Sequence, residues 1–304
     1  MKRMIERLLP AVLLTVPGIV SAQPGLDDEP EPARPMLISA SDGLVAGTTN
    51  TLAVSFDLDE GWHVYWPGQN ATGFAPTVEL TLPEGWVAGE ILWPAPHRYV
   101  SPGDILDHVY EDGEATFLVP VTVPADAEIG PVRLSADMEW LVCREACIPG
   151  WGTVTLETTV LPAGARVAPS SHTERFEAAR KRFAEPYRPA MRSRRAPPTR
   201  AVSLKWNDGT LTIAPAEKGL PRAPVSIAFY PDDQGSPIAK LLETGASASE
   251  KPGVLPAPLR LTRQDASKPV SGIIEVGFGK GERPALYRIE TRPGDESTNP
   301  GRGG

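Results

Sequence analysis

The chain alternates apolar and polar residues in short runs, the pattern of β-strands that bury one face. Glycine, proline and aspartate residues separate these runs and favour turns. Because the runs follow one another at fairly regular spacing between Leu37 and Val160, we predict an antiparallel sandwich of immunoglobulin-like type there. The predicted strands are residues 51–58, 77–82, 115–123, 132–140 and 152–160.

The pattern changes after the first sandwich. Residues 173–184 combine good helix formers with apolar residues at helical spacing, and prolines among arginines then predict a semi-rigid basic linker. Strand patterns return from residue 201, with a hairpin predicted across the Asn207-Asp208-Gly209 turn. The predicted fold class is all-β, with two immunoglobulin-like β-sandwich domains joined by a short helix and a basic, proline-rich linker. The later predicted strands are residues 202–206, 210–213, 225–230, 272–278 and 285–290.

The amino terminus has the pattern of a secretory signal peptide. A basic start precedes an apolar run from Leu8 to Val20, and the small residues Ser21 and Ala22 follow. No later run approaches the roughly 20 apolar residues of a transmembrane helix, so we expect a soluble periplasmic protein without a membrane span once the signal is removed. The predicted parts are a signal peptide (1–22), a first sandwich (23–165), a helix and linker (166–199), a second sandwich (200–292) and a disordered tail (293–304).

Composition narrows the function classes. The formal net charge of −8 is spread along the chain, which argues against a nucleic-acid-binding surface. No Ser/His/Asp order, phosphate-binding loop or paired-carboxylate signature stands out, and we expect no cofactor. The only two cysteines, Cys143 and Cys147, are therefore the main candidates for chemistry.

The spacing of the two cysteines requires a turn if they are bonded. Four residues along a continuous strand would separate the Cα atoms by roughly 13 Å, whereas a disulfide requires about 4.4–6.8 Å. Strand alternation places Cys143 on the same face as Arg133 and Glu139, which is the polar face. A sulfur on that face would be open to attack by another thiolate.

Three interpretations of the pair remain open on spacing alone. A disulfide that encloses so few residues stabilises little through chain entropy, which favours redox exchange over a structural disulfide without deciding between them. Metal ligation is the third interpretation, but copper or zinc would need further ligands. The candidates have no close spacing to the cysteines, so we expect no metal site; they are Met138, His63, His97 and His108.

Several segments, taken together and in order, resemble one family: the amino-terminal domain of the thiol:disulfide interchange protein DsbD, especially its ScsB-like subtype. They extend from the GWHVYWPG stretch that begins at Gly61 to the WLVCREACIP stretch that ends at Pro149. The matching segments are residues 61–68, 93–99, 109–111 with 117–123, and 140–149.

The resemblance implies an immunoglobulin-like periplasmic domain that accepts electrons through its cysteine pair and passes them to partners. Cys143 and Cys147 would be its catalytic residues, as a possible component of a protein-disulfide reductase. The implied partners are a membrane electron-transfer protein of DsbD/CcdA type and periplasmic thioredoxin-like or disulfide-bonded proteins. Because the sequence ends at Gly304 without the membrane and thioredoxin-like domains of the family, we expect a separately encoded membrane reductase.

The resemblance also implies a mechanism and a cap. One thiolate would attack a partner's disulfide and the second cysteine would resolve the mixed disulfide, and the sequence does not assign these two roles. A cap loop would shield the pair, with Tyr99, Ile105 and Tyr110 as candidate shielding residues. Two other functions remain: a noncatalytic two-domain binding or scaffold protein with a structural disulfide, and a copper-tolerance accessory.

Overall fold

The structure is a computed structural model that describes residues 31–111, 113–187, 201–215, 222–249, 251 and 253–295. The predicted signal peptide, the linker from residue 188 to 199 and the tail from residue 296 lie outside the described residues. Within the described ranges, no helix has the length and apolarity to cross a membrane.

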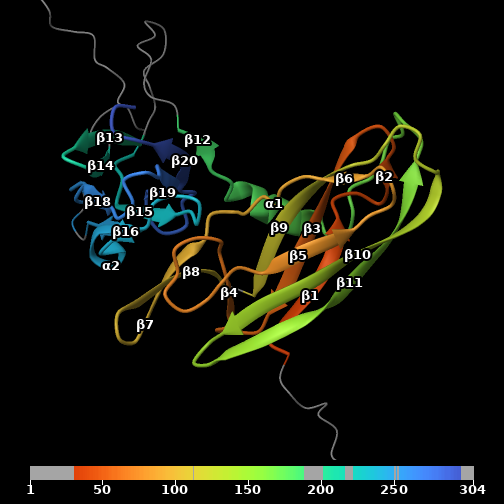
Figure 1. The fold of residues 1–304 in the computed structure, drawn as a ribbon, viewed down its shortest axis with the longest axis horizontal. Coiled ribbons are helices and arrows are strands. Elements are labelled where there is room, and N and C mark those ends of the chain that lie inside the picture. Colours follow the sequence, from red (N-terminus) through yellow and green to blue (C-terminus); the bar gives the residue numbers. More distant parts are fainter. Residues whose placement is uncertain are drawn as a thin grey trace, which may run out of the picture. The chain divides into compact units, whose positions relative to one another are not determined.

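Residues 33–161 form two sheets that share one hydrophobic core (Figure 1). The four-stranded sheet has the order β1-β3-β9-β6, and the seven-stranded sheet has the order β2-β11-β10-β4-β8-β7, with β5 also paired to β10. All of these pairings are antiparallel except that of β2 with β11. The strands are β1 (Ala33–Ser39), β2 (Leu44–Val45), β3 (Thr49–Leu58), β4 (His63–Tyr65), β5 (Thr77–Thr81), β6 (Val87–Ala88), β7 (His97–Ser101), β8 (Ile105–Tyr110), β9 (Glu114–Thr122), β10 (Gly130–Cys143) and β11 (Cys147–Leu161).

Alternation along β10 explains which face enters the core. Leu134, Ala136 and Met138 are buried, whereas Asp137 and Glu139 between and beyond them are exposed. Farther along the same face, the Trp140 ring meets the ring of Phe56 edge-on, with 5.7 Å between their centroids. The five strands predicted in this region are confirmed, most of them with longer bounds in the structure.

The helix α1 (Thr173–Lys181) covers the four-stranded sheet. Phe176 and Ala179 pack against Leu118 of β9, and the Arg175 guanidinium donates a 2.6 Å hydrogen bond to the Asp57 carboxylate. The prediction of a helix is confirmed, although the helix ends at Lys181 rather than Ala184.

The rest of the described chain forms two further sheets around a second core. The predicted hairpin is confirmed as β13 and β14, where Asp208 and Gly209 have φ angles of 45° and 77°. The sheet orders are β12-β20-β19-β15-β17 and β13-β14-β18-β16. The elements are β12 (Glu185–Pro186), β13 (Val202–Asn207), β14 (Thr210–Pro215), β15 (Ser226–Pro231), β16 (Ile238–Ala239), α2 (Leu241–Thr244), β17 (Ala246–Ala248), β18 (Leu259–Arg263), β19 (Val270–Gly277) and β20 (Ala285–Thr291).

These elements confirm the predicted all-β fold class. The contacts of the described residues from Pro32 onward group them as one compact unit, so the division of this part into two domains stays a prediction.

Candidate functional site

The cysteine pair closes the end of the β10–β11 hairpin, whose two long strands lie side by side in Figure 1. Cys143 and Cys147 are direct partners in the strand register, with a Cα–Cα distance of 4.1 Å, and they form a disulfide. Residues 144–146 make the turn between them, in which the Arg144 backbone N–H donates a 3.1 Å hydrogen bond to the Ala146 carbonyl. The disulfide bond therefore joins two residues that the hairpin already holds side by side.

The two sulfur-bearing residues differ in exposure. Cys147 is exposed, whereas Cys143 is only 3% exposed. Cys143 keeps the alternation of the face that carries Glu139, as predicted, but the end of this face is not open. Tyr65 of β4 and Val109 of β8 cover it and form a small cluster with Cys143. An incoming thiolate can therefore reach Cys147 more readily than Cys143.

His63 lies beside the buried cysteine. It is the register partner of Cys143 and is 2% exposed, and its ring centroid lies 4.6 Å from that of Tyr99. Its Nδ1 atom has no hydrogen-bond partner among the described residues. Burial lowers the pKa of His63, against an opposing effect of the Asp107 charge. A neutral His63 supplies no positive charge to favour a thiolate on the neighbouring cysteine.

A chain of hydrogen-bonding groups leads from a buried carboxylate to the exposed cysteine. The Asp107 side chain, in a residue only 2% exposed, accepts hydrogen bonds from the backbone N–H groups of Ala71 (2.8 Å) and Thr72 (3.0 Å). The Thr72 hydroxyl donates to the other Asp107 oxygen at 2.7 Å and lies 3.1 Å from the Tyr65 hydroxyl. The Tyr65 hydroxyl lies 3.8 Å from the Cys147 Sγ atom. Burial is the largest effect on the pKa of Tyr65 and raises it, so the phenol stays protonated at neutral pH.

The three predicted shielding residues occupy different places. Tyr99 of β7 is half-buried and packs against the cluster that contains Cys143. Tyr110 lies in the main core, where its hydroxyl donates a 2.7 Å hydrogen bond to the Pro94 carbonyl. Ile105 begins β8 and is 36% exposed. Tyr99 is thus the one of the three that the structure brings to the cysteine cluster, and shielding stays a prediction.

The other candidate ligands are dispersed. Met138 is a core residue, His97 is half-buried on β7, and His108 is fully buried on β8. Among the described residues, no group of three or more histidine, cysteine, aspartate or glutamate side chains could hold a metal ion.

His108 predicts a pH dependence of stability. Its Nδ1 atom bonds the Gln69 carbonyl at 2.7 Å, while its buried Nε2 atom has no partner among the described residues. Burial lowers the pKa of His108 to about 4, so between about pH 6.5 and 4 the unfolded chain binds a proton that the folded chain does not. Stability from this group is therefore full above about pH 6.5 and is lost as the pH falls, by about 3 kcal/mol in total. Urea unfolding at pH 7, 5.5 and 4.5 should show this loss, and His108→Phe should lessen it; an equal loss in both proteins would contradict the assignment.

Sequence reasoning missed three residues of this site: Tyr65, Thr72 and Asp107. Tyr65 lay inside a segment quoted for the resemblance, but its role required the neighbours to be known. The one available signal for Asp107 was an acidic residue within the largely apolar Ile105–Tyr110 run. Thr72 gave no signal.

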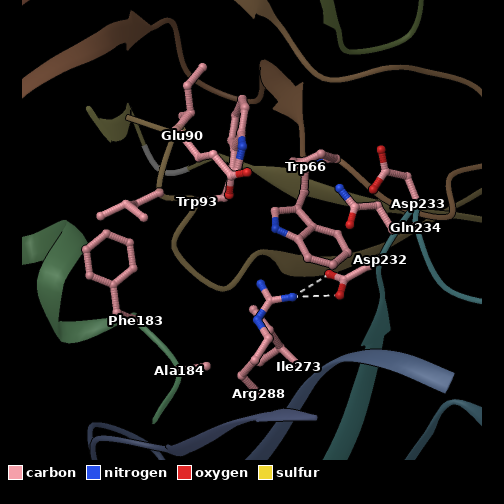
Figure 2. Close-up of a pocket in the computed structure, with 13 residues that line it drawn as sticks. Trp66, Glu90, Trp93, Phe183, Ala184, Asp232, Asp233, Gln234, Ile273 and Arg288 are labelled. Atoms are coloured by element: carbon pink, nitrogen blue, oxygen red, sulfur yellow. Dashed lines mark hydrogen bonds and ion pairs between the residues drawn. The ribbon is translucent and has the colours of Figure 1, made fainter. Parts of the chain in front are cut away.

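A pocket elsewhere in the chain does not include the cysteines (Figure 2). Figure 2 shows the Arg288 guanidinium directed at the Asp232 carboxylate, to which it donates hydrogen bonds at 2.6 Å beside the ring of Trp66. The residues that line this pocket include none of the hydrogen-bonding groups described above, which are Asp107, Thr72, Tyr65 and Cys147.

Residues 35–159 match the family model described as the N-terminal domain of the thiol:disulfide interchange protein DsbD. The match confirms the predicted resemblance, and it spans both cysteines and the chain of groups from Asp107 to Tyr65. The part of the chain that holds the candidate site therefore matches this family.

Solved structures give two further likenesses. The N-terminal periplasmic domain of ScsB from Proteus mirabilis is 14% identical over 82% of this chain and 90% of its own chain, with a TM-score of 0.48. The reduced DsbD N-terminal domain of Neisseria meningitidis is 15% identical over 47% of this chain and 96% of its own, with a TM-score of 0.27. No curated protein matches the chain.

Proposed function

We propose that the protein is a periplasmic thiol-disulfide interchange protein that relays electrons through Cys143 and Cys147. In this proposal a separate membrane electron-transfer protein of DsbD/CcdA type reduces the pair, and the pair then reduces thioredoxin-like or disulfide-bonded partners in the periplasm. The observation that carries the proposal is an exposed cysteine, Cys147, disulfide-bonded at a hairpin tip within the region that matches the DsbD N-terminal domain.

The reduction of the pair takes two exchange steps. A thiolate of the donor attacks the Cys147 Sγ atom, the bond to Cys143 breaks, and Cys143 leaves as a thiolate that takes a proton. The donor's second thiolate then attacks the donor's first sulfur in the mixed disulfide, and Cys147 leaves as a thiolate that takes a proton. The donor dithiol is oxidised to a disulfide, and the Cys143–Cys147 disulfide is reduced to two thiols.

The burial of Cys143 favours one alternative, a structural disulfide in a noncatalytic binding or scaffold protein. A structural disulfide would resist protein dithiols, whereas a relay pair must exchange with them. The two functions therefore predict opposite behaviour towards the same reagent.

Reduction by a protein dithiol tests the proposed function. The oxidised protein would be incubated with an excess of a reduced thioredoxin-like protein, and new thiols would be counted by alkylation and mass measurement. We expect both cysteines to become alkylated within minutes, because Cys147 is an exposed residue that a partner's thiolate can approach. A native disulfide that stays intact under these conditions, yet is reduced after unfolding, would overturn the proposed function in favour of the structural alternative.

A further inference from the structure

The direction of each hydrogen bond between Asp107 and Cys147 follows from counting protons. An ionised carboxylate only accepts, and a hydroxyl group has one proton to donate. The Thr72 hydroxyl donates its proton to Asp107 at 2.7 Å, so towards Tyr65 it can only accept. The Tyr65 hydroxyl must therefore donate its own proton to Thr72.

Once the Tyr65 hydroxyl donates its only proton to Thr72, its oxygen can offer only lone pairs to any other neighbour. One such neighbour is the Cys147 Sγ atom, 3.8 Å away. In the oxidised protein the sulfur carries no proton. Once the pair is reduced, a Cys147 thiol can donate its proton to the Tyr65 oxygen, whereas a thiolate would face the same lone pairs without a donor.

We propose that Asp107 and Thr72 are positioning residues that hold Tyr65 as a hydrogen-bond acceptor, so that reduced Cys147 is kept as a thiol rather than a thiolate. This inference rests on the proposed function, because the reduced state matters only if the pair cycles.

The backbone around Thr72 holds the arrangement in place. Asp107 accepts the backbone N–H groups of Ala71 and Thr72 as well as the Thr72 hydroxyl, so the carboxylate fixes the loop and not only one side chain. The next residue, Gly73, lies directly against the Tyr65 ring, where a Cβ atom would come within 2.1 Å of a ring carbon. The Tyr65 ring is confined, so its oxygen is held between Thr72 and the sulfur, and the hydrogen bond to Thr72 fixes where its proton points.

Among the charged groups near the cysteine pair, Asp107 and Glu145 disfavour a thiolate and Arg144 favours one. Asp107 contributes a negative charge, and the buried His63 is neutral at neutral pH. The Arg144 guanidinium in the turn lies over the Trp62 ring, 5.1 Å from its centroid. The titratable groups next to the pair are His63 and Tyr65 of β4 and Tyr99 of β7. Asp107 of β8 is connected to the pair through Thr72 and Tyr65, and Arg144 and Glu145 belong to the turn between the cysteines.

The consequence is a reduced pair with low intrinsic reactivity. The thiolate is the nucleophile in exchange, so a thiol held by Tyr65 reacts slowly with small oxidants. When Cys147 attacks a partner's disulfide, its proton is lost and a new S–S bond forms. The partner's second sulfur then leaves as a thiolate and takes up a proton.

Site-resolved alkylation of the reduced protein tests the inference. The full chain would be reduced with a strong chemical reductant and treated with iodoacetamide between about pH 6 and 10, with modification of each cysteine followed by mass spectrometry. We expect Thr72→Val to free the Tyr65 proton to turn towards Cys147 and to raise its alkylation rate at pH 7 about tenfold, which corresponds to a pKa lower by one unit. Thr72→Ser keeps the hydroxyl and should match the wild-type rate.

Two further variants test whether Tyr65 lowers or raises the alkylation rate of Cys147, and whether the effect is specific to this hydroxyl. Tyr65→Phe removes the acceptor and should raise the Cys147 rate at pH 7 several-fold, a result that decides the question even if Thr72→Val does not fold. Thr116→Val removes another buried hydroxyl, bonded to Ser55 at 2.7 Å, and should leave the rate unchanged. A slower Cys147 in Tyr65→Phe would mean that Tyr65 donates to the thiolate, and the inference would be wrong.

The two proposals fail separately. Chemical reduction and alkylation need no partner, so they report on the inference even if a protein dithiol fails to reduce the pair. Conversely, a normal exchange with the dithiol and unchanged alkylation in Thr72→Val and Tyr65→Phe would overturn only the inference.

Discussion

Cys143→Ser should trap a mixed disulfide with a partner, and Cys147→Ser should trap at least tenfold less. Cys147 is exposed, whereas Cys143 is 3% exposed beneath Tyr65 and Val109. The remaining thiol of Cys143→Ser can reach a partner's disulfide, and no neighbouring cysteine is left to resolve the adduct. Each purified variant would be mixed with a thioredoxin-like protein that keeps one active-site cysteine, activated as a mixed disulfide with a small thiol that leaves on attack. The reaction would be quenched with acid and separated on a non-reducing gel.

The trapping comparison has an internal control. Unfolding the two variants in denaturant before mixing exposes both thiols, and the difference between them should largely disappear. Equal trapping by the folded variants, or stronger trapping by Cys147→Ser, would contradict the assignment of Cys147 as the attacking residue.

Phe56→Ala should destabilise the fold by about 3–5 kcal/mol. The Phe56 ring is fully buried between the two sheets of the first core. Its centroid lies 5.7 Å from that of the Trp140 ring and 6.2 Å from that of the Phe117 ring. Truncation removes a large apolar side chain and leaves a cavity that these rings can fill only in part. The free energy of unfolding in urea would measure the loss.

Trp151→Ala is the matched control for this loss. Trp151 is also aromatic and also belongs to the first pair of sheets, but it is 75% exposed. Its truncation should change the free energy of unfolding by less than about 0.5 kcal/mol. A similar loss in both variants would show that the core around Phe56 does not carry the stability assigned to it.

The strands that sequence patterns predicted are those with one buried face. Along β10 the buried residues Leu134, Ala136 and Met138 alternate with polar ones, so the period of two is visible in the sequence. β8 gave no such signal, because all residues from Leu106 to Tyr110 are buried, including an aspartate and a histidine. A strand covered on both faces has no alternation to detect.

The candidate site was predictable only in part. The cysteines stood out because they are the only two in the sequence, and the turn between them followed from disulfide geometry. The burial of Cys143 was not predictable, because its cover comes from Tyr65 and Val109 in strands distant in sequence. Asp107 acts through Thr72 and Tyr65, and local patterns contain no information about such long-range contacts.

The three-residue turn ties the redox equilibrium of the pair to the stability of the hairpin through a thermodynamic cycle. A cross-link across so short a loop stabilises the folded state by about 2 kcal/mol in the chain-entropy model. The cycle then requires the folded protein to hold its disulfide more strongly than the unfolded chain by the same amount, about 40 mV for two electrons. The electron-transfer potential of the pair should therefore stay close to that of a short peptide with the same sequence, and the fold can persist through repeated oxidation and reduction.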